Sequence, residues 1–160
     1  MIVLFDLGDG FAWCKPIFHP EIFTRFTDQT TLNKYLRDRI LQKHQTTYLF
    51  ISNQQASIID TFQVNFNGFS KYIYCPDENS VNEFETQNGV RGDHKIITIN
   101  ELETSLHSKA VELYFSLMHR STNDSTTQKT YAQRYNYHIN CLELSSRQFL
   151  DDPPGSQPTA

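Results

Sequence analysis

The chain has 160 residues and a formal net charge of −4, which is enough length for one ordinary domain with a buried core. No run of Lys or Arg exceeds two residues, and this excludes nucleic-acid binding through a basic face, because such affinity comes mainly from neutralised phosphates. Aromatic residues form 13% of the chain and supply large buried area, which excludes a wholly disordered protein.

The N-terminus and the cysteines indicate the compartment. Met1–Asp6 has no charged region before its apolar residues and reaches an acid at once, unlike a signal peptide. The longest apolar run is far shorter than the roughly 20 residues that span a bilayer. The three cysteines, Cys14, Cys75 and Cys141, form no CxxC pair, and an odd count argues against a disulfide framework. We therefore expect a cytoplasmic protein in a reducing setting, without membrane contact.

The first predicted element is a short apolar strand, Ile2–Leu7, which Gly8-Asp9-Gly10 ends. Residues 11–20 are aromatic and contain two prolines, which exclude a long helix. We expect their aromatic side chains, together with Phe23, to lie over one face of a sheet. An amphipathic helix that begins at Thr30 or Thr31 and runs to about residue 43 follows from the helical spacing of its apolar residues.

The central predicted strand is Thr47–Asn53, in which near-continuous apolar residues end abruptly at Ser52 and Asn53. Such a run is typical of a strand covered by helices on both faces, in the middle of a parallel sheet. In open α/β sheets, ligands and partners bind outside the carboxyl ends of such strands. We therefore predict a binding edge at Ser52 and Asn53.

The elements after this strand continue the alternation. They are a weaker helix over 56–66, a strand over 71–75, a helix over 80–87, a strand over 95–99 and a long helix over 100–118. Ser80 and Glu83 have capping-box spacing, and Asn100 is the expected cap of the long helix. Repetition of strand and helix about every 25 residues is typical of right-handed parallel βαβ units. It predicts an α/β, open three-layer α/β/α domain with a mostly parallel sheet of four or five strands, of the receiver or flavodoxin type.

The predicted domain organisation has four parts. Residues 1–120 form the receiver-like α/β domain, and the wholly polar residues 121–130 form a linker or long loop. Residues 131–150 form a C-terminal helix, because aromatic and aliphatic residues recur there at helical spacing. Residues 151–160, rich in proline, form a disordered tail.

With these strands assigned, the chain resembles the N-terminal α/β domain that precedes ADP-ribosyltransferase or tetratricopeptide modules in bdelloid rotifer proteins, itself similar to the signal-receiver fold. The resemblance covers about residues 2–118 and rests on strand endings and helix starts: Ile2–Asp6, Tyr35-Leu36, Leu49-Phe50-Ile51-Ser52, Tyr72-Ile73-Tyr74-Cys75, Gly89-Val90, and Ile97-Thr98-Ile99 before Leu102 and Leu106. It implies an accessory, regulatory or protein-contacting module, with catalysis elsewhere in a longer polypeptide. Residues 11–20 are an insertion relative to that pattern.

The acids after the strands could form a phosphoryl-transfer site. Asp6 and Asp9 are three residues apart, whereas haloacid-dehalogenase phosphatases place two carboxylates two residues apart beside Mg²⁺. Receivers need an acidic pair, a phosphoacceptor and a lysine. Asp77 is the only candidate phosphoacceptor after a middle strand, and no lysine follows Ile99 directly. A Mg²⁺-dependent enzyme or phosphoacceptor using Asp6 and Asp9 is therefore the alternative rather than the favoured function.

The segment Ser52–Gln55 lies between a strand and a helix, where free backbone amides can bind an anion. It contains no glycine, which a phosphate-binding loop uses for close approach, so an ordinary helix cap is favoured over nucleotide sensing. If nucleotide sensing were correct, an uncovered, concave pocket would lie there.

No metal and no cofactor are expected. The six histidines are scattered, and His107 and His119 lie about 18 Å apart along the predicted long helix at 1.5 Å per residue. No cysteine accompanies a histidine at ligand spacing. Cys75 is interpreted as a buried strand cysteine, although a dyad with a distant histidine stays open, because catalytic partners need only be neighbours in space.

The sequence thus predicts a non-catalytic, receiver-like regulatory or protein-interaction module with a protein partner. Its contact surface is either the edge formed by Asp6, Asp9, Ser52, Asn53 and Asp77 or the aromatic C-terminal helix, through which copies could also associate as a homo-oligomer. Whether the chain is an enzyme stays open, with the balance against it.

Overall fold

The computed structural model describes residues 1–8, 10–40, 46–61, 69–88, 94–121 and 124–151. The chain divides into two compact units, the N-terminal unit Met1–Leu102 and the C-terminal unit Glu103–Ala160. Each unit is described by itself.

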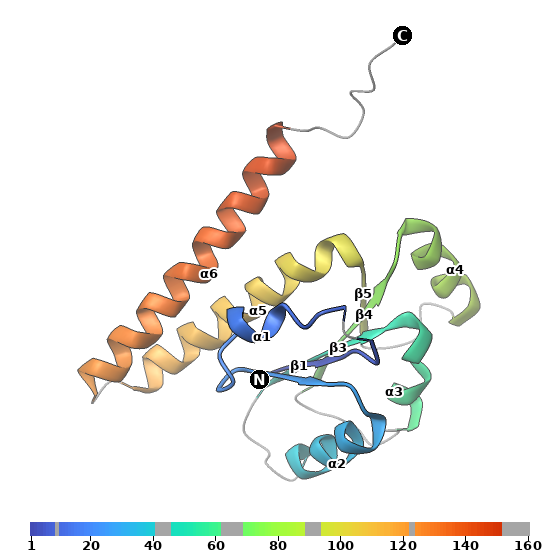
Figure 1. The fold of residues 1–160 in the computed structure, drawn as a ribbon, viewed down its shortest axis with the longest axis horizontal. Coiled ribbons are helices and arrows are strands. Elements are labelled where there is room, and N and C mark those ends of the chain that lie inside the picture. Colours follow the sequence, from blue (N-terminus) through green and yellow to red (C-terminus); the bar gives the residue numbers. More distant parts are fainter. Residues whose placement is uncertain (9, 41–45, 62–68, 89–93, 122–123, 152–160) are drawn as a thin grey trace. The chain divides into compact units, whose positions relative to one another are not determined.

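The N-terminal unit is built on a five-stranded, all-parallel sheet in the order β2-β1-β3-β4-β5 (Figure 1). Its strands are β1 (Ile2–Phe5), β2 (Phe23–Phe26), β3 (Thr47–Ser52), β4 (Phe69–Cys75) and β5 (His94–Thr98). This order is one of the two common orders of doubly wound α/β sheets. The α/β class with a parallel sheet and flanking helices is therefore confirmed, and β3 does lie at the centre of the sheet.

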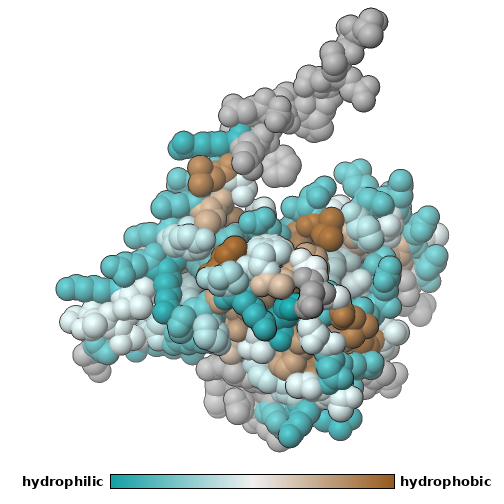
Figure 2. Space-filling model, in the orientation of Figure 1, coloured by the Kyte–Doolittle hydropathy of each residue, from teal (hydrophilic) through white to brown (hydrophobic). Residues whose placement is uncertain are grey.

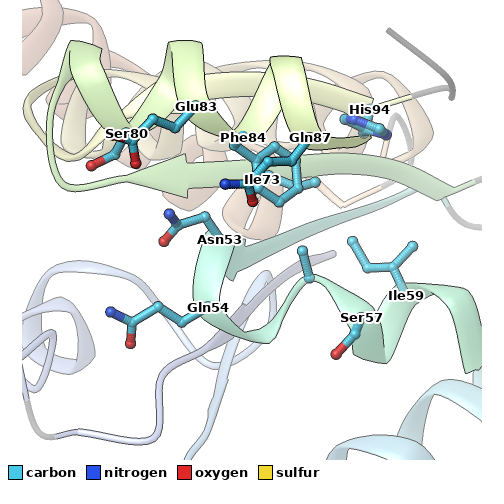
Figure 3. A pocket seen from close by; sticks show the side chains of 11 residues that line it. Asn53, Gln54, Ser57, Ile59, Ile73, Ser80, Glu83, Phe84, Gln87 and His94 are labelled. Carbon is cyan, nitrogen blue, oxygen red and sulfur yellow. The ribbon is translucent and has the colours of Figure 1, made fainter. Parts of the chain in front are cut away.

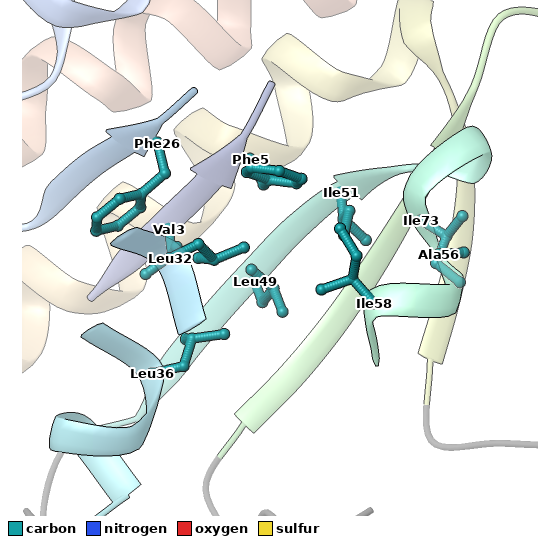
Figure 4. Close-up of a cluster of buried hydrophobic side chains, with 10 residues drawn as sticks. All are labelled: Val3, Phe5, Phe26, Leu32, Leu36, Leu49, Ile51, Ala56, Ile58 and Ile73. Atoms are coloured by element: carbon teal, nitrogen blue, oxygen red, sulfur yellow. The ribbon is translucent and has the colours of Figure 1, made fainter. Parts of the chain in front are cut away.

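Helices follow the strands in the expected alternation. They are α1 (Cys14–Ile17), α2 (Gln29–Ile40), the short 3-10 helix η1 (Asn53–Gln55), α3 (Ser57–Thr61) and α4 (Glu78–Asn88). One face of the sheet carries the cluster in Figure 4, where strand residues such as Val3 and Leu49 meet Leu32 and Leu36 of α2 and Ile58 of α3. The apolar stripe predicted for α2 thus covers this face, whereas Ile58 of α3 lies outside the stripe predicted for that helix.

The opposite face of the sheet is aromatic. Tyr72 and Tyr74 share this face, as their spacing of two predicts, and Phe50 stacks on Tyr72 with ring centroids 4.5 Å apart. Phe11 contacts Tyr74 edge-on at 5.4 Å, and the ring of Phe18 stacks on Phe23 at 5.2 Å. The aromatic segment before β2 therefore lies over this face, as expected.

Strand β2 is a departure from the prediction. Phe23–Phe26 was assigned to no strand, yet its four residues pair in parallel with β1, from Ile2 with Phe23 to Phe5 with Phe26. The sequence Phe-Thr-Arg-Phe is neither a continuous apolar run nor an alternating one, so it has no strand period. Its extended form depends on the hydrogen bonds that β1 offers.

Two helices begin earlier than predicted, and each begins after an aspartate. Helix α2 begins at Gln29, because Asp28 accepts hydrogen bonds from the backbone N–H and the hydroxyl of Thr31, both at 2.6 Å. These hydrogen bonds lower the pKa of Asp28. Helix α4 begins at Glu78, because Asp77 accepts the backbone N–H of Ser80 at 2.7 Å. Ser80 is thus inside the helix, and the predicted caps at Thr30, Thr31 and Ser80 are wrong.

Helix α5 (Ile99–Arg120) also begins before the predicted cap. The carboxylate of Glu101 accepts hydrogen bonds from the backbone N–H and the hydroxyl of Thr98, at 2.7 and 3.1 Å. This is the returning half of a capping box, so Thr98 rather than Asn100 precedes the helix.

The C-terminal unit contains most of α5 together with α6 (Ser125–Asp151), joined by residues 121–124 as a helical hairpin (Figure 1). Tyr114 and Tyr131 lie 6.2 Å apart between the two helices, and Phe115 and Tyr135 lie 6.3 Å apart. Among the described residues, no helix combines the length and apolar character that a membrane span needs.

The predicted linker at 121–130 is wrong over most of its length, since α6 starts at Ser125. Asp124 accepts the backbone N–H groups of Thr126 and Thr127 at 3.0 and 3.1 Å and so caps the helix. The residues around this helix start are polar and carry no apolar period, so the sequence did not reveal where the helix begins. Apart from Asp151, the predicted tail at 151–160 lies outside the described residues.

The core of the N-terminal unit yields a first prediction. Leu36 is 1% exposed in the cluster of Figure 4, and Leu36→Ala should lower the free energy of unfolding by about 2–5 kcal/mol through lost burial and a cavity. The control, Leu7→Ala, removes a side chain that is 56% exposed and should change it by less than about 0.5 kcal/mol. Urea denaturation measures both, and equal effects would contradict the assigned core.

Candidate functional site

The carboxyl ends of the parallel strands meet at one edge of the sheet. Asp6 follows β1, Ser52 ends β3 and Asn53 follows it, while Asp77 lies two residues beyond β4. The strand order reverses between β1 and β3, which is where open α/β sheets form their ligand crevices. Four of the five predicted site residues therefore lie along this edge, and Asp9 lies outside the described residues.

Asp6 is held inside the protein by an ion pair. Its Oδ2 accepts a hydrogen bond from Nη2 of Arg25 at 2.9 Å, and the Asp6 and Arg25 side chains are 11% and 3% exposed. The backbone N–H groups of Gly8 and Phe11 also donate to the carboxylate, both at 3.2 Å. The same Arg25 nitrogen donates to the carbonyl of Gly8 at 2.6 Å. The acid after β1 therefore organises its own loop and is neutralised by β2.

Tyr74 is buried next to this ion pair. Its hydroxyl donates to the carbonyl of Phe5, the last residue of β1, at 3.2 Å. Burial and the negative charge of Asp6 raise the pKa of Tyr74 well above its usual value, so the phenol stays protonated. Tyr74 thus acts as a structural hydrogen-bond donor across β1 and β4.

Asp77 and Cys75 have structural roles at the end of β4. Asp77 is fully exposed, and hydrogen bonds from Ser80 lower its pKa, as suits a carboxylate that caps a helix. Burial, followed by the negative charges of Asp77 and Glu85, raises the pKa of the Cys75 thiol. A raised pKa keeps Cys75 in its unreactive thiol form.

Of the two predicted caps, Ser52 and Asn53, Ser52 caps η1. Its hydroxyl oxygen accepts the backbone N–H of Gln54 at 3.3 Å and donates to the side-chain oxygen of Asn53 at 3.4 Å. The Gln54 amide, one of those that could bind an anion here, is therefore already bonded.

A groove of about 550 Å³ runs from this edge along the sheet, between η1 and α3 on one side and α4 on the other. Figure 3 shows Ile73 and Phe84 at its centre, Asn53 and Gln54 on the η1 side, and Glu83 and Gln87 on α4. We call this the α3–α4 groove. Its lining residues are Asn53, Gln54, Ala56, Ser57, Ile59, Ile73, Ser80, Glu83, Phe84, Gln87 and His94.

The walls of the α3–α4 groove carry mainly polar side chains, and its floor is apolar. Three amide side chains and two hydroxyls line it, and apart from His94 the one ionisable side chain among the lining residues is Glu83. The groove therefore favours an uncharged or cationic occupant over an anion. On the face shown in Figure 2, hydrophobic residues form separate small groups in a largely hydrophilic surface.

Asn53 is a predicted site residue, whereas Arg25 and the α4 wall of the groove were not predicted. Arg25 was hidden because its partner Asp6 is 19 residues away and the strand holding it was not predicted. Ser80, Glu83, Phe84 and Gln87 recur at helical spacing, a signal that could have marked one face of α4. Within the described part of the chain, no three His, Cys, Asp or Glu side chains are grouped as metal ligands.

Comparison with known proteins found no match to a family model, to a curated protein or to a solved structure.

The ion pair yields a second prediction. Arg25→Met should lower the free energy of unfolding by about 3–5 kcal/mol, because it leaves the Asp6 carboxylate buried without its cation. Adding Asp6→Asn should restore part of the loss, since no uncompensated charge then remains. Chemical denaturation measures both variants beside Arg37→Met, which removes an exposed arginine of α2 and should change little. A double variant no better than Arg25→Met would contradict this role.

Proposed function

We propose that this chain is a non-catalytic, receiver-like regulatory or protein-interaction module that binds its partner in the α3–α4 groove. The observation that carries the proposal is the groove itself, a cavity of about 550 Å³ at the carboxyl ends of β3 and β4. The resemblance to accessory domains ahead of ADP-ribosyltransferase or tetratricopeptide modules supports a role in binding rather than in catalysis.

The lining favours an extended peptide segment with a basic side chain. Amide side chains such as Asn53 and Gln87 both donate and accept hydrogen bonds, which matches a peptide backbone. The carboxylate of Glu83 can pair with a Lys or Arg head group, and the apolar floor at Ile73 suits the aliphatic stem of such a side chain.

The alternative of phosphoryl transfer using Asp6 and Asp9 is disfavoured by the surroundings of Asp6. An acid that binds Mg²⁺ or attacks phosphorus needs free oxygen lone pairs, whereas this carboxylate already accepts bonds from Arg25 and two backbone amides. The remaining candidate phosphoacceptor, Asp77, caps α4.

The alternative of nucleotide sensing at Ser52–Gln55 has one observation in its favour, because the groove reaches Asn53 and Gln54. The phosphates of a nucleotide would find no Lys or Arg among the lining residues, and the Gln54 amide is bonded to Ser52. A phosphate would therefore be desolvated beside Glu83 without a compensating charge. The peptide occupant is favoured for this reason.

A cytoplasmic location and self-association through α6 are further parts of the proposal. Tyr137 and Leu144 of α6 are 48% and 61% exposed, which supports a contact surface on this helix.

A third prediction concerns phosphoryl chemistry. Millimolar Mg²⁺ with beryllofluoride, which mimics an acyl phosphate on aspartate, should cause no saturable shift in the amide NMR signals of Asp6, Ser52 and Asp77. The reason is that Asp6 is bonded to Arg25 and Asp77 is bonded to Ser80. Saturable shifts clustered on these amides would sink the non-catalytic assignment.

A fourth prediction concerns the groove. A short acetylated peptide with one arginine between glycines and serines should shift the amide signals of Asn53, Ser57 and Gln87. Citrulline in place of arginine should weaken binding, and glutamate should weaken it most. Glu83→Gln should lower the affinity for the arginine peptide by about twofold to fivefold, the range for an exposed ion pair.

The matched control for this prediction is Glu85→Gln, which removes an acid from the same helix but outside the groove lining. It should leave the affinity unchanged. Tighter binding of the glutamate peptide, or shifts confined to other parts of the sheet, would contradict the assigned occupant.

A further inference from the structure

Two buried histidines face each other inside the helical hairpin of the C-terminal unit. His107 of α5 and His138 of α6 are each 2% exposed, and their Nδ1 atoms lie 2.7 Å apart. This is hydrogen-bond distance, so one imidazole donates and the other accepts. The two residues are 31 positions apart in the chain, so their pairing is not visible in the sequence.

Aromatic rings enclose the pair within the hairpin. Tyr114 of α5 stacks on His138 with centroids 5.7 Å apart, and Tyr137 of α6 meets His138 edge-on at 5.1 Å. Tyr137 is also 6.4 Å from the His107 ring. These rings shield the imidazoles from water, so a charge on either one loses most of its solvation.

The charged and titratable groups of the hairpin near the pair are few. Glu103 of α5 places Oε1 3.8 Å from Nε2 of His107, and its side chain is 58% exposed. Arg134 of α6 lies over the Tyr114 ring at 5.9 Å. Burial is the main cause that raises the pKa of the Tyr137 phenol, and its hydrogen bond with Cys141 of α6 is the second. Glu103 is therefore the one group of this set that favours a proton on the pair.

The pair can hold one hydrogen between its Nδ1 atoms. Glu103 favours the proton of His107 on Nε2, which leaves Nδ1 of His107 as the acceptor and makes His138 the Nδ1–H donor. One additional proton can be taken up on Nε2 of His138, and the Nδ1–H of His138 still donates to Nδ1 of His107. A second additional proton would make both Nδ1 atoms donors at 2.7 Å, and the hydrogen bond would become a repulsion between two buried cations.

We propose that the His107–His138 pair makes the α5–α6 hairpin an acid-sensitive switch, closed while the imidazoles share a hydrogen bond and opened when protons are added. The open hairpin exposes the α5 and α6 surfaces that pack around the pair. The switch is separate from the α3–α4 groove and does not depend on what the groove binds.

The direction of the pH dependence follows from linkage. Burial, and then the positive charge of His107, lowers the pKa of His138 from its ordinary value near 6.5 to about 4, and burial also lowers the pKa of His107. The open hairpin therefore takes up protons as soon as the pH falls below about 6.5, while the closed hairpin takes them up only nearer pH 4. Closure is fully stabilised above about pH 6.5 and is progressively lost as the pH falls toward 4.

The test combines histidine NMR with amide hydrogen exchange on the whole chain. Ring ¹⁵N signals should report a hydrogen-bonded pair at neutral pH and a His138 pKa well below 6.5. Protection factors of α6 amides near His138, corrected for intrinsic exchange, should fall on the order of tenfold to thirtyfold between pH 7.5 and 5. Amides of β3 should show no such change, which separates hairpin opening from acid unfolding of the whole chain.

Two variants complete the test. His107→Leu combined with His138→Leu should abolish the fall in protection, because no imidazole remains to titrate. His119→Gln, which removes an exposed histidine of the same helix α5, should leave the fall unchanged. Should the double variant fail to fold, the wild-type measurements decide alone. Titration of both rings near pH 6.5, constant α6 protection, or an unchanged fall in the double variant would each overturn the proposal.

Discussion

The ion pair between Asp6 and Arg25 determines the chemistry at the carboxyl end of β1, next to the point where the strand order reverses. A carboxylate buried after β1 needs a cation, and β2 supplies one because its four-residue pairing with β1 places Arg25 beside the strand end. The same arginine nitrogen holds the Gly8 carbonyl, so strand, loop and edge strand are joined at one point. The position where comparable folds place reactive acids is consequently occupied by a structural link.

The ion pair occupies the β1 end of the edge, so the binding that we propose falls on the other half. Beyond β3, the sheet face continues into the α3–α4 groove, where Ile73 lies between polar walls contributed by η1 and α4. An apolar floor supplies burial, and side chains that both donate and accept hydrogen bonds supply orientation. Asp6 is neutralised internally, and Glu83 is the acid among the lining residues of the groove, which is the basis of the proposed preference for a basic side chain there.

Prediction from sequence succeeded where a signal is local. The buried run of β3 and the small polar residues that end it identified the central strand and a helix cap at Ser52 or Asn53, which the structure assigns to Ser52. Prediction failed for residues whose structure depends on a partner far away in the sequence. Strand β2 exists because β1 offers hydrogen bonds, and Arg25 matters because Asp6 is near it in space. The predicted helix starts differ from the observed ones by a few residues. The observed starts follow Asp28, Asp77 and Asp124, which accept amide hydrogen bonds, and the spacing of apolar residues does not reveal such caps.

The histidine pair illustrates the same limit for the C-terminal unit and adds a constraint on register. Tyr114 faces Tyr131, and His107 faces His138, so equivalent contacts recur seven residues apart on both antiparallel helices. A shift of one helical turn would leave each imidazole buried against carbon without a partner, and an unsatisfied buried polar group costs about 1–3 kcal/mol. Apolar side chains alone tolerate such a shift far better. The hydrogen bond between His107 and His138 therefore specifies one alignment of α5 and α6 at neutral pH. Protonation of both imidazoles removes this hydrogen bond, and with it the preference for that alignment.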